Sequence, residues 1–183
     1  MRNIEIVGRT FTFTGRPGDP YFENGSPSDC RLFNMALHKI PTEATIFDVG
    51  ANIGMTVAMA KLIRPDATVY CFEPDPQAYD FLIKNLASNN LTNCLPAQVA
   101  LSDRTGKLSF FNNPTSASAS HLVEDATAGI IVDVMTLDQV VEAHRVKQID
   151  LIKIDVEGFE ADVLRGAECS LRAFRPIVGS VSV

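Results

Sequence analysis

The chain has 183 residues, a length that one domain of ordinary size accounts for. Hydrophobic residues make up 46% and charged residues 21%, as in globular proteins, and no apolar run approaches the roughly 18 residues that span a membrane. The 16 basic and 22 acidic side chains give a net charge of −6 without a basic stripe, which argues against nucleic acid as a partner.

The cysteines and the N-terminus predict a cytoplasmic protein. The first eight residues lack the apolar core of a signal peptide. The four cysteines have neither metal-binding nor disulfide-framework spacing, so we expect free, inert thiols in a reducing compartment. They are Cys30, Cys71, Cys94 and Cys169.

The first 43 residues are predicted to form a cap on the main domain, which spans residues 44–183. Residues 4–14 alternate like an antiparallel strand or hairpin, residues 15–28 are a loop rich in Gly and Pro, and residues 29–40 are typical of a helix.

From residue 45 onward, short apolar runs alternate with amphipathic stretches, which predicts an α/β fold with a parallel sheet. The first unit is a strand over residues 45–49 and a helix over 53–63 that stops before Pro65. The second is a strand over residues 68–73, followed by a helix that begins at Pro74-Asp75-Pro76.

The middle of the chain predicts a third strand at residues 95–101 and a hairpin of residues 107–111 and 130–134. A polar loop joins the two strands of this hairpin and includes the Ser/Ala run 116–120. We expect this loop to be a long, mobile tip.

The last third predicts a helix over residues 136–144 capped by Thr136, a fourth strand over 149–155, a helix over 159–174 and a fifth strand over 177–183. The fifth strand is apolar, with few charges to protect an open edge. Such an edge recruits other chains, so it predicts a homodimer or aggregation.

The turn after the first parallel strand is the most informative segment. Gly50 and Gly54 stand at a strand-to-helix turn, where a ligand can approach the backbone closely. Asn52 replaces a glycine of the dinucleotide fingerprint, and Asp48 would oppose a pyrophosphate. The pattern therefore favours a ligand that carries an ammonium or sulfonium.

Glu73 ends the second strand, about 20 residues beyond the loop, where a carboxylate can accept both ribose hydroxyls of a nucleoside. The ligand is thus expected to be nucleoside-like. The structural alternative is that Asp48 and Glu73 only cap the helices that follow them.

Asp155 and Glu157 form a second acidic pair at the end of the fourth strand. Strand geometry would place both on one face, roughly 6.6 Å apart. Capping of the next helix is again the alternative. Lys153, inside the same apolar strand, must extend to the surface or pair with an acid, and a structural ion pair is favoured over a catalytic lysine.

Five segments in order resemble the FkbM family of S-adenosylmethionine-dependent methyltransferases, over residues 45–183. The most diagnostic is Leu-Ile-Lys-Ile-Asp-Val-Glu-Gly-Phe-Glu at 151–160, followed by Val-Leu-Arg-Gly-Ala at 163–167. The others are Asp-Val-Gly-Ala-Asn-Ile-Gly at 48–54, Phe-Glu-Pro at 72–74, Ala-Leu-Ser-Asp at 100–103 and Thr-Leu-Asp at 136–138.

The resemblance implies a Rossmann-like class I methyltransferase fold with helices on both faces of a twisted sheet, and S-adenosylmethionine as cofactor. Asp155 and Glu157 would face the transferred methyl as catalytic residues. The cofactor would be held at the methionine end, the ribose and the adenine by Asp48, Gly50, Asn52, Gly54, Glu73, Pro74, Ser102 and Asp103.

By the same resemblance, the acceptor would be a hydroxyl or carboxyl of a sugar, polyketide or other small metabolite. Acceptor contacts are expected from residues 1–40 and 112–124, which are cap and loop segments. The related fold has seven strands and closes with an antiparallel pair. That pair is missing here, because the sequence ends in the fifth strand.

Two other functions are compatible with the fold. A nicotinamide oxidoreductase is disfavoured by Asn52 and by the lack of a Tyr-x-x-x-Lys pair, and a non-catalytic binding domain is supported only by the missing strands. No metal is expected, because the histidines lack ligand spacing. They are His38, His121 and His144.

Overall fold

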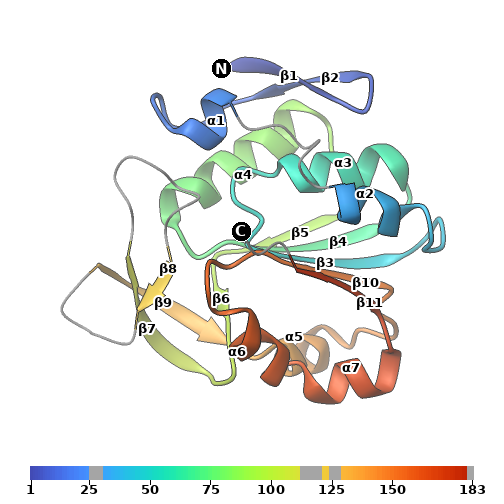
Figure 1. Cartoon of the computed structure of the whole chain (residues 1–183), viewed down its shortest axis with the longest axis vertical. Helices are drawn as coiled ribbons and strands as arrows, with labels where there is room; N and C mark the ends of the chain where they lie inside the picture. Colours follow the sequence, from blue (N-terminus) through green and yellow to red (C-terminus); the bar gives the residue numbers. More distant parts are fainter. Residues whose placement is uncertain (25–30, 112–120, 124–128, 181–183) are drawn as a thin grey trace.

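A parallel sheet of five strands forms the centre of the protein in a computed structural model, which describes residues 1–24, 31–111, 121–123 and 129–180 (Figure 1). The strand order is β11-β10-β3-β4-β5. The strands are β3 (Thr45–Val49), β4 (Thr68–Phe72), β5 (Cys94–Ala97), β10 (Leu151–Ile154) and β11 (Ile177–Ser180). The predicted parallel sheet is thereby confirmed.

Helices cover both faces of this sheet, as the alternating pattern predicts (Figure 1). One face carries α2 (Arg31–Leu37), α3 (Met55–Ile63) and α4 (Pro76–Ser88), and the other carries α5 (Leu137–His144), α6 (Glu160–Arg165) and α7 (Glu168–Phe174). Successive side chains of β3 point to opposite faces of the sheet. Ile46 packs in the core under the first group of helices, and Phe47 packs in the core under the second. In the described part of the chain, no helix is long and apolar enough to cross a membrane.

A smaller sheet of four strands lies beside the first, in the order β6-β9-β7-β8. Its strands are β6 (Ala100–Leu101), β7 (Gly106–Phe111), β8 (His121–Val123) and β9 (Ile130–Met135). The predicted hairpin of β7 and β9 is present, but β8 adds a third strand that pairs with β7. The expected mobile tip, including 116–120, lies outside the described residues.

The single strand expected at residues 95–101 is wrong. Its two ends belong to different sheets, because β5 ends at Ala97 while β6 pairs with β9. The break falls at the exposed Gln98, and the buried residues Val99, Ala100 and Leu101 follow it. One polar residue between apolar ones is also common within a strand, so the pattern alone does not show that the chain changes sheet here.

The single helix expected at residues 159–174 is also wrong, because α6 and α7 are separate helices. Gly166 lies between them against the backbone of Ser102, where an added Cβ would stand 1.9 Å from the Ser102 carbonyl oxygen. The Asp138 carboxylate then accepts hydrogen bonds from the backbone N–H groups of Cys169 and Ser170, at 3.0 and 2.8 Å, and so stabilises the start of α7.

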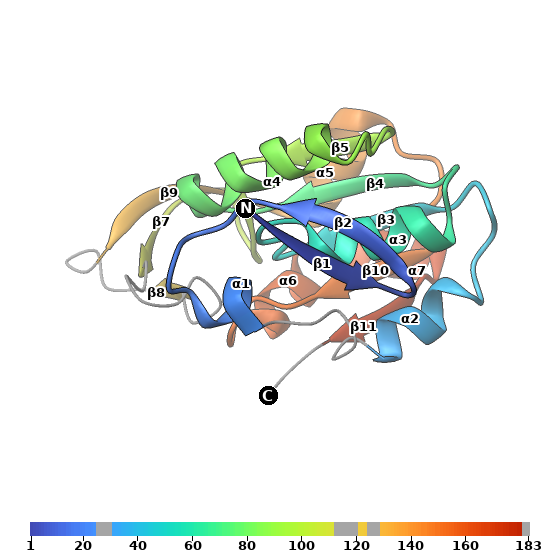
Figure 2. The same ribbon diagram turned by 90° about the horizontal axis from the view of Figure 1, so that it is seen from above.

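The N-terminal segment forms a hairpin, β1 (Arg2–Ile6) with β2 (Arg9–Phe13), followed by the short helix α1 (Pro20–Asn24) inside the predicted loop. The hairpin lies over the layer of α3 and α4 (Figure 2). Its Phe11 and Phe13 are buried in the same apolar core as these helices, so it is part of one folded body.

Candidate functional site

An open pocket of about 700 Å³ lies at the carboxyl ends of β3, β4 and β10. β3 and β10 are neighbours that lead to opposite sides of the sheet, which is the switch point where parallel α/β folds bind ligands. The described residues that line it are Tyr21, Val49, Gly50, Asn52, Phe72, Glu73, Pro74, Val99, Ala100, Leu101, Phe110, Asp155, Val156 and Glu157.

The loop between β3 and α3 has a backbone that only certain residues adopt. Gly50 has φ 77°, and a Cβ there would stand 1.9 Å from the backbone oxygen of Asp155. Asn52 has φ 49°, a left-handed conformation that Asn tolerates better than most residues. Gly50 is therefore required by a contact within the protein, because a side chain there would collide with the Asp155 backbone.

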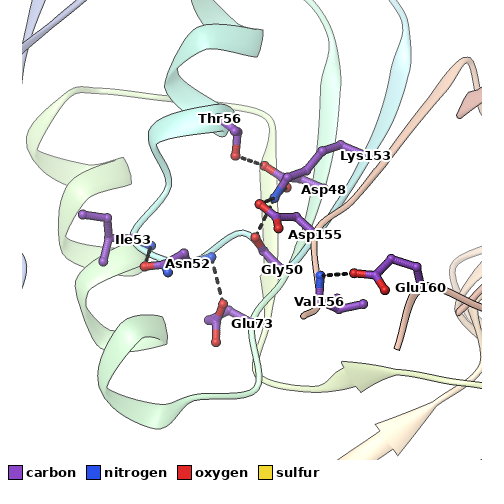
Figure 3. A network of polar contacts seen from close by, with 10 residues as sticks. All are labelled: Asp48, Gly50, Asn52, Ile53, Thr56, Glu73, Lys153, Asp155, Val156 and Glu160. Atoms are coloured by element: carbon purple, nitrogen blue, oxygen red, sulfur yellow. Dashed lines mark hydrogen bonds and ion pairs between the residues drawn. The ribbon is translucent and has the colours of Figure 1, made fainter. Parts of the chain in front are cut away.

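Glu73 receives two backbone hydrogen bonds at the edge of the pocket. Its Oε2 accepts from the Asn52 N–H at 2.8 Å (Figure 3). Its Oε1 accepts from the Asp75 N–H, also at 2.8 Å. Burial raises the pKa of the Glu73 carboxyl to about 7. The two N–H donors favour the ionised form and so lower this pKa, but burial has the larger effect. The carboxylate is thus held in one orientation and titrates near neutral pH.

A buried ionic cluster lies behind the pocket (Figure 3). Lys153 Nζ is 3.0 Å from Asp48 Oδ1 and 3.6 Å from Asp155 Oδ2, and it donates to the Gly50 carbonyl oxygen at 2.7 Å. Thr56 donates its hydroxyl hydrogen to the other Asp48 oxygen. Pairing of Lys153 with an acid is confirmed. Asp48 is fully buried, and its charge is paired with Lys153 rather than exposed in the pocket.

Asp155 and Glu157 both line the pocket, but not as neighbours on one strand face. The fourth strand ends at Ile154 rather than at residue 155, and Glu157 has φ 50°, so the chain turns where strand geometry was expected. Burial raises the pKa of the Asp155 carboxyl, and Lys153 partly offsets this. Glu157 is exposed at the mouth.

The capping alternative is wrong for Asp48, Glu73 and Asp155. Asp75 caps α4 by accepting from the Gln77 and Ala78 N–H groups at 2.7 and 3.2 Å. The N-cap residues of α3 and α6 are Gly54 and Phe159, and neither makes a side-chain cap.

Four predicted cofactor residues are not among the described residues that line the pocket: Asp48, Gly54, Ser102 and Asp103. Ser102 is buried, and its N–H donates to the Met135 carbonyl at 2.9 Å. Asp103 lies 3.9 Å from both Arg104 and Arg165. Val99, Ala100 and Leu101, which come just before, line the pocket in their place.

Sequence reasoning missed Phe110, and it included Tyr21 only as part of residues 1–40, from which acceptor contacts were expected; both are aromatic side chains of the pocket wall. Tyr21 comes from α1 and Phe110 from β7 of the second sheet, and no local pattern links them to the loops after β3 and β4. It also missed Asn85, which is 1% exposed on α4. A polar residue three positions after the buried Leu82 was the available signal.

The sequence of this chain matches the methyltransferase FkbM domain over residues 48–183. The chain belongs to this family. The match starts at Asp48 within β3 and includes every described pocket residue except Tyr21.

Two curated relatives of this chain are methyltransferases. Hexuronic acid methyltransferase AglP of Haloferax volcanii is 28% identical over 147 residues, which cover 80% of this chain and 59% of the relative. The 2-O-methyltransferase NoeI of Sinorhizobium fredii is 30% identical over 150 residues, 73% of this chain and 61% of the relative. This chain thus spans about three-fifths of the length of these relatives.

A solved structure of another protein has a similar fold. The precorrin-6y C5,15-methyltransferase of Geobacter metallireducens superposes with a TM-score of 0.50 at 11% identity, over 86% of this chain and 61% of that chain. The Rossmann-like methyltransferase fold expected from the sequence is confirmed.

Proposed function

We propose that the protein binds S-adenosylmethionine in the pocket and transfers its methyl group to a hydroxyl or carboxyl oxygen of a small metabolite, such as a sugar or polyketide. The observation that carries this is the charge of the pocket. Glu73, Asp155 and Glu157 line it, and none of the described lining residues is basic. A cationic sulfonium and ammonium suit such a site, whereas a pyrophosphate does not. Family membership supports the same reaction.

The residues present fit this cofactor. Glu73 is held by two N–H groups and keeps oxygen lone pairs for the ribose hydroxyls, with Pro74 beside it. Gly50 and Asn52 would hold the methionine end, and the apolar stretch 99–101 would flank the adenine. In this proposal Asp48 and Gly54 shape the loop and do not contact the cofactor. Ser102 and Asp103 come directly after residues 99–101, which flank the adenine, and do not contact it either.

The cofactor supplies a methyl group on a positively charged sulfur, which is already activated. The protein must place the acceptor oxygen in line with that methyl group, so positioning provides most of the rate. When bound, the cofactor would give its methyl group to the acceptor oxygen and would keep the electron pair of the carbon–sulfur bond, leaving as a neutral thioether. Asp155 or Glu157 takes the proton of an alcohol acceptor.

Titration calorimetry with S-adenosylhomocysteine and with NAD tests the proposed cofactor. Binding of the first and not of the second is expected, because the pocket acids oppose a pyrophosphate. The opposite preference would favour the nicotinamide oxidoreductase. Binding of S-adenosylhomocysteine without turnover of any hydroxylated acceptor in a panel would favour the non-catalytic binding domain.

Glu157→Gln should slow methyl transfer to an alcohol acceptor by about 10² to 10⁴ if this exposed carboxylate is the general base. Cofactor affinity should change little, since Glu157 is exposed at the mouth of the pocket, where water and salt screen its charge more than those of Glu73 and Asp155. Single-turnover rates and calorimetry measure the two effects separately. Asp155→Asn is the matched variant, and a full rate in Glu157→Gln with a slow Asp155→Asn would assign the base to Asp155.

We also propose a homodimer through the edge strand β11 of a cytoplasmic protein. Ile177 and Val178 are 37% and 39% exposed, and β11 pairs with β10 on one side among the described residues. Val178→Lys should shift the protein to monomer, because a charge there opposes edge-to-edge pairing. Light scattering over a dilution series checks this, and a monomer at every concentration in the parent protein would refute it.

A further inference from the structure

Two asparagines, Asn85 of α4 and Asn89 at the C-terminal cap of this helix, bind the backbone of the N-terminal hairpin. Asn85 accepts from the Thr14 N–H at 2.7 Å and donates to the Thr14 carbonyl at 2.9 Å. Asn89, one helical turn later, does the same with Thr12 at 2.9 and 2.8 Å. The two side-chain amides therefore bind Thr12 and Thr14 in the way a neighbouring strand would, and they satisfy polar groups along this edge.

The two asparagines differ in their remaining hydrogen bond. Asn85 Nδ2 also donates to the carbonyl of Ile53, at 2.9 Å, in the loop between β3 and α3. Asn89 Nδ2 donates to the Asn85 carbonyl of its own helix, at 2.8 Å. Asn85, which is 1% exposed, thus connects the hairpin, α4 and the pocket loop, whereas Asn89 connects only the hairpin and α4.

The Ile53 carbonyl belongs to the part of the loop that orients Glu73 (Figure 3). Asn52 precedes Ile53, and its N–H donates to Glu73 Oε2. The Asn52 side chain accepts from the Ile53 N–H at 2.8 Å. Because Asn52 has a left-handed backbone, this geometry persists only where surrounding contacts hold it. Asn85 provides such a contact one residue away.

We infer that Asn85 is a positioning residue for nucleoside binding: it fixes the 52–53 loop, and through it the Glu73 carboxylate, and it makes the N-terminal hairpin part of the binding site. The inference rests on the proposed function for its ligand. It assigns a role to a helix residue that lies outside the pocket and to residues before 48, where the family match begins.

Asn85→Ala tests this role against Asn89→Ala, the matched control. Both variants lose two hydrogen bonds to the hairpin, but only Asn85→Ala loses the bond to the loop. Calorimetry with adenosine, well below each unfolding midpoint, should show about tenfold weaker binding for Asn85→Ala and nearly parental binding for Asn89→Ala. Asn85→Asp keeps the shape and the acceptor oxygen but lacks the N–H groups, so it should resemble Asn85→Ala.

The pH dependence of adenosine binding separates positioning from loss of stability. Glu73 faces the charged groups of Asp75 and Lys153, and Asp155 and Glu157 share its pocket. Neither asparagine variant changes these four groups. A loosened loop in Asn85→Ala should weaken the Asn52 N–H bond, which favours the ionised form of the Glu73 carboxyl. The pH at which binding is half-maximal should therefore rise in Asn85→Ala and stay unchanged in Asn89→Ala.

Hydrogen exchange in the ligand-free protein makes the inference testable apart from the cofactor. The Asn52 amide should exchange faster in Asn85→Ala than in Asn89→Ala. If the parent protein binds neither adenosine nor S-adenosylhomocysteine, the proposed function fails while this comparison still decides the inference. Equal exchange and equal pH midpoints in the two variants would overturn it, as would unfolding of both Asn85 variants with Asn89→Ala intact, which would show a purely structural role.

Discussion

Glu73→Ala should weaken the binding of S-adenosylhomocysteine by at least about tenfold, because hydrogen bonds to a charged group are worth roughly 1.5 to 3 kcal/mol each and about 1.4 kcal/mol is a factor of ten. The carboxylate lines the pocket and is fixed by the N–H groups of Asn52 and Asp75. Calorimetry measures the loss. Glu157→Gln, at the mouth of the same pocket, is the control that should keep its affinity.

Glu73→Gln sharpens this test. Glutamine has the same size but one acceptor oxygen, so it can satisfy only one of the two backbone N–H groups. We therefore expect it to bind nearly as weakly as the alanine variant. An affinity equal to that of the parent protein in both variants would remove Glu73 from the binding site.

The pH dependence of binding has a definite sign. The pKa of Glu73 is about 7 in the free protein, raised mainly by burial. Ribose hydroxyls donate to the ionised carboxylate, so affinity for adenosine should increase as the pH rises through this value. In Glu73→Gln the dependence should disappear. A parental affinity that falls over the same range would contradict the assigned hydrogen bonds.

The sequence predicts the strands and the acids of the site well because both depend on local pattern. Glu73 follows a short run of β-branched and aromatic residues, and Asp155 follows another, so each lies at the carboxyl end of a buried strand. Parallel strands bring such ends to one edge of the sheet. Glu73 and Asp155 do line one pocket at this edge, as expected. Their contacts to a cofactor stay predictions.

What the sequence does not predict are contacts between distant segments. Asp48 was expected to face a cation of the ligand, but the register that pairs it with Lys153 on the next strand supplies the cation from the protein itself. Gly166 interrupts a helical pattern because the Ser102 backbone passes beside it. In both cases the partner lies more than 60 residues away, beyond any local period.

Lys153→Met should lower the free energy of unfolding by about 3 to 5 kcal/mol, because it leaves a buried carboxylate without its partner. Asp48 is fully buried, the Lys153 side chain is 3% exposed, and their charged atoms are 3.0 Å apart. The substitution also removes the donor to the Gly50 carbonyl, so the pocket loop should loosen. Denaturant unfolding measures the change.

The control is Lys107→Met, which breaks an ion pair with Asp133 at the surface. This pair is shorter, at 2.7 Å, but its side chains are 67% and 66% exposed, so the expected loss is below about 1 kcal/mol. Both lysines contact a carboxylate on a neighbouring strand. A difference in the loss of stability between the two variants is therefore due to the burial of the ion pair and not to the distance between its charges.

A second substitution shows whether the uncompensated charge is the cause. Asp48→Asn keeps an oxygen that can accept from the Thr56 hydroxyl, but carries no charge. Combined with Lys153→Met it should restore most of the lost stability, although each single variant is destabilised, because the double variant buries no unpaired charge at this position. Additive losses in the double variant would mean that Lys153 stabilises the protein through the Gly50 carbonyl and Asp155, and that the pair with Asp48 contributes little.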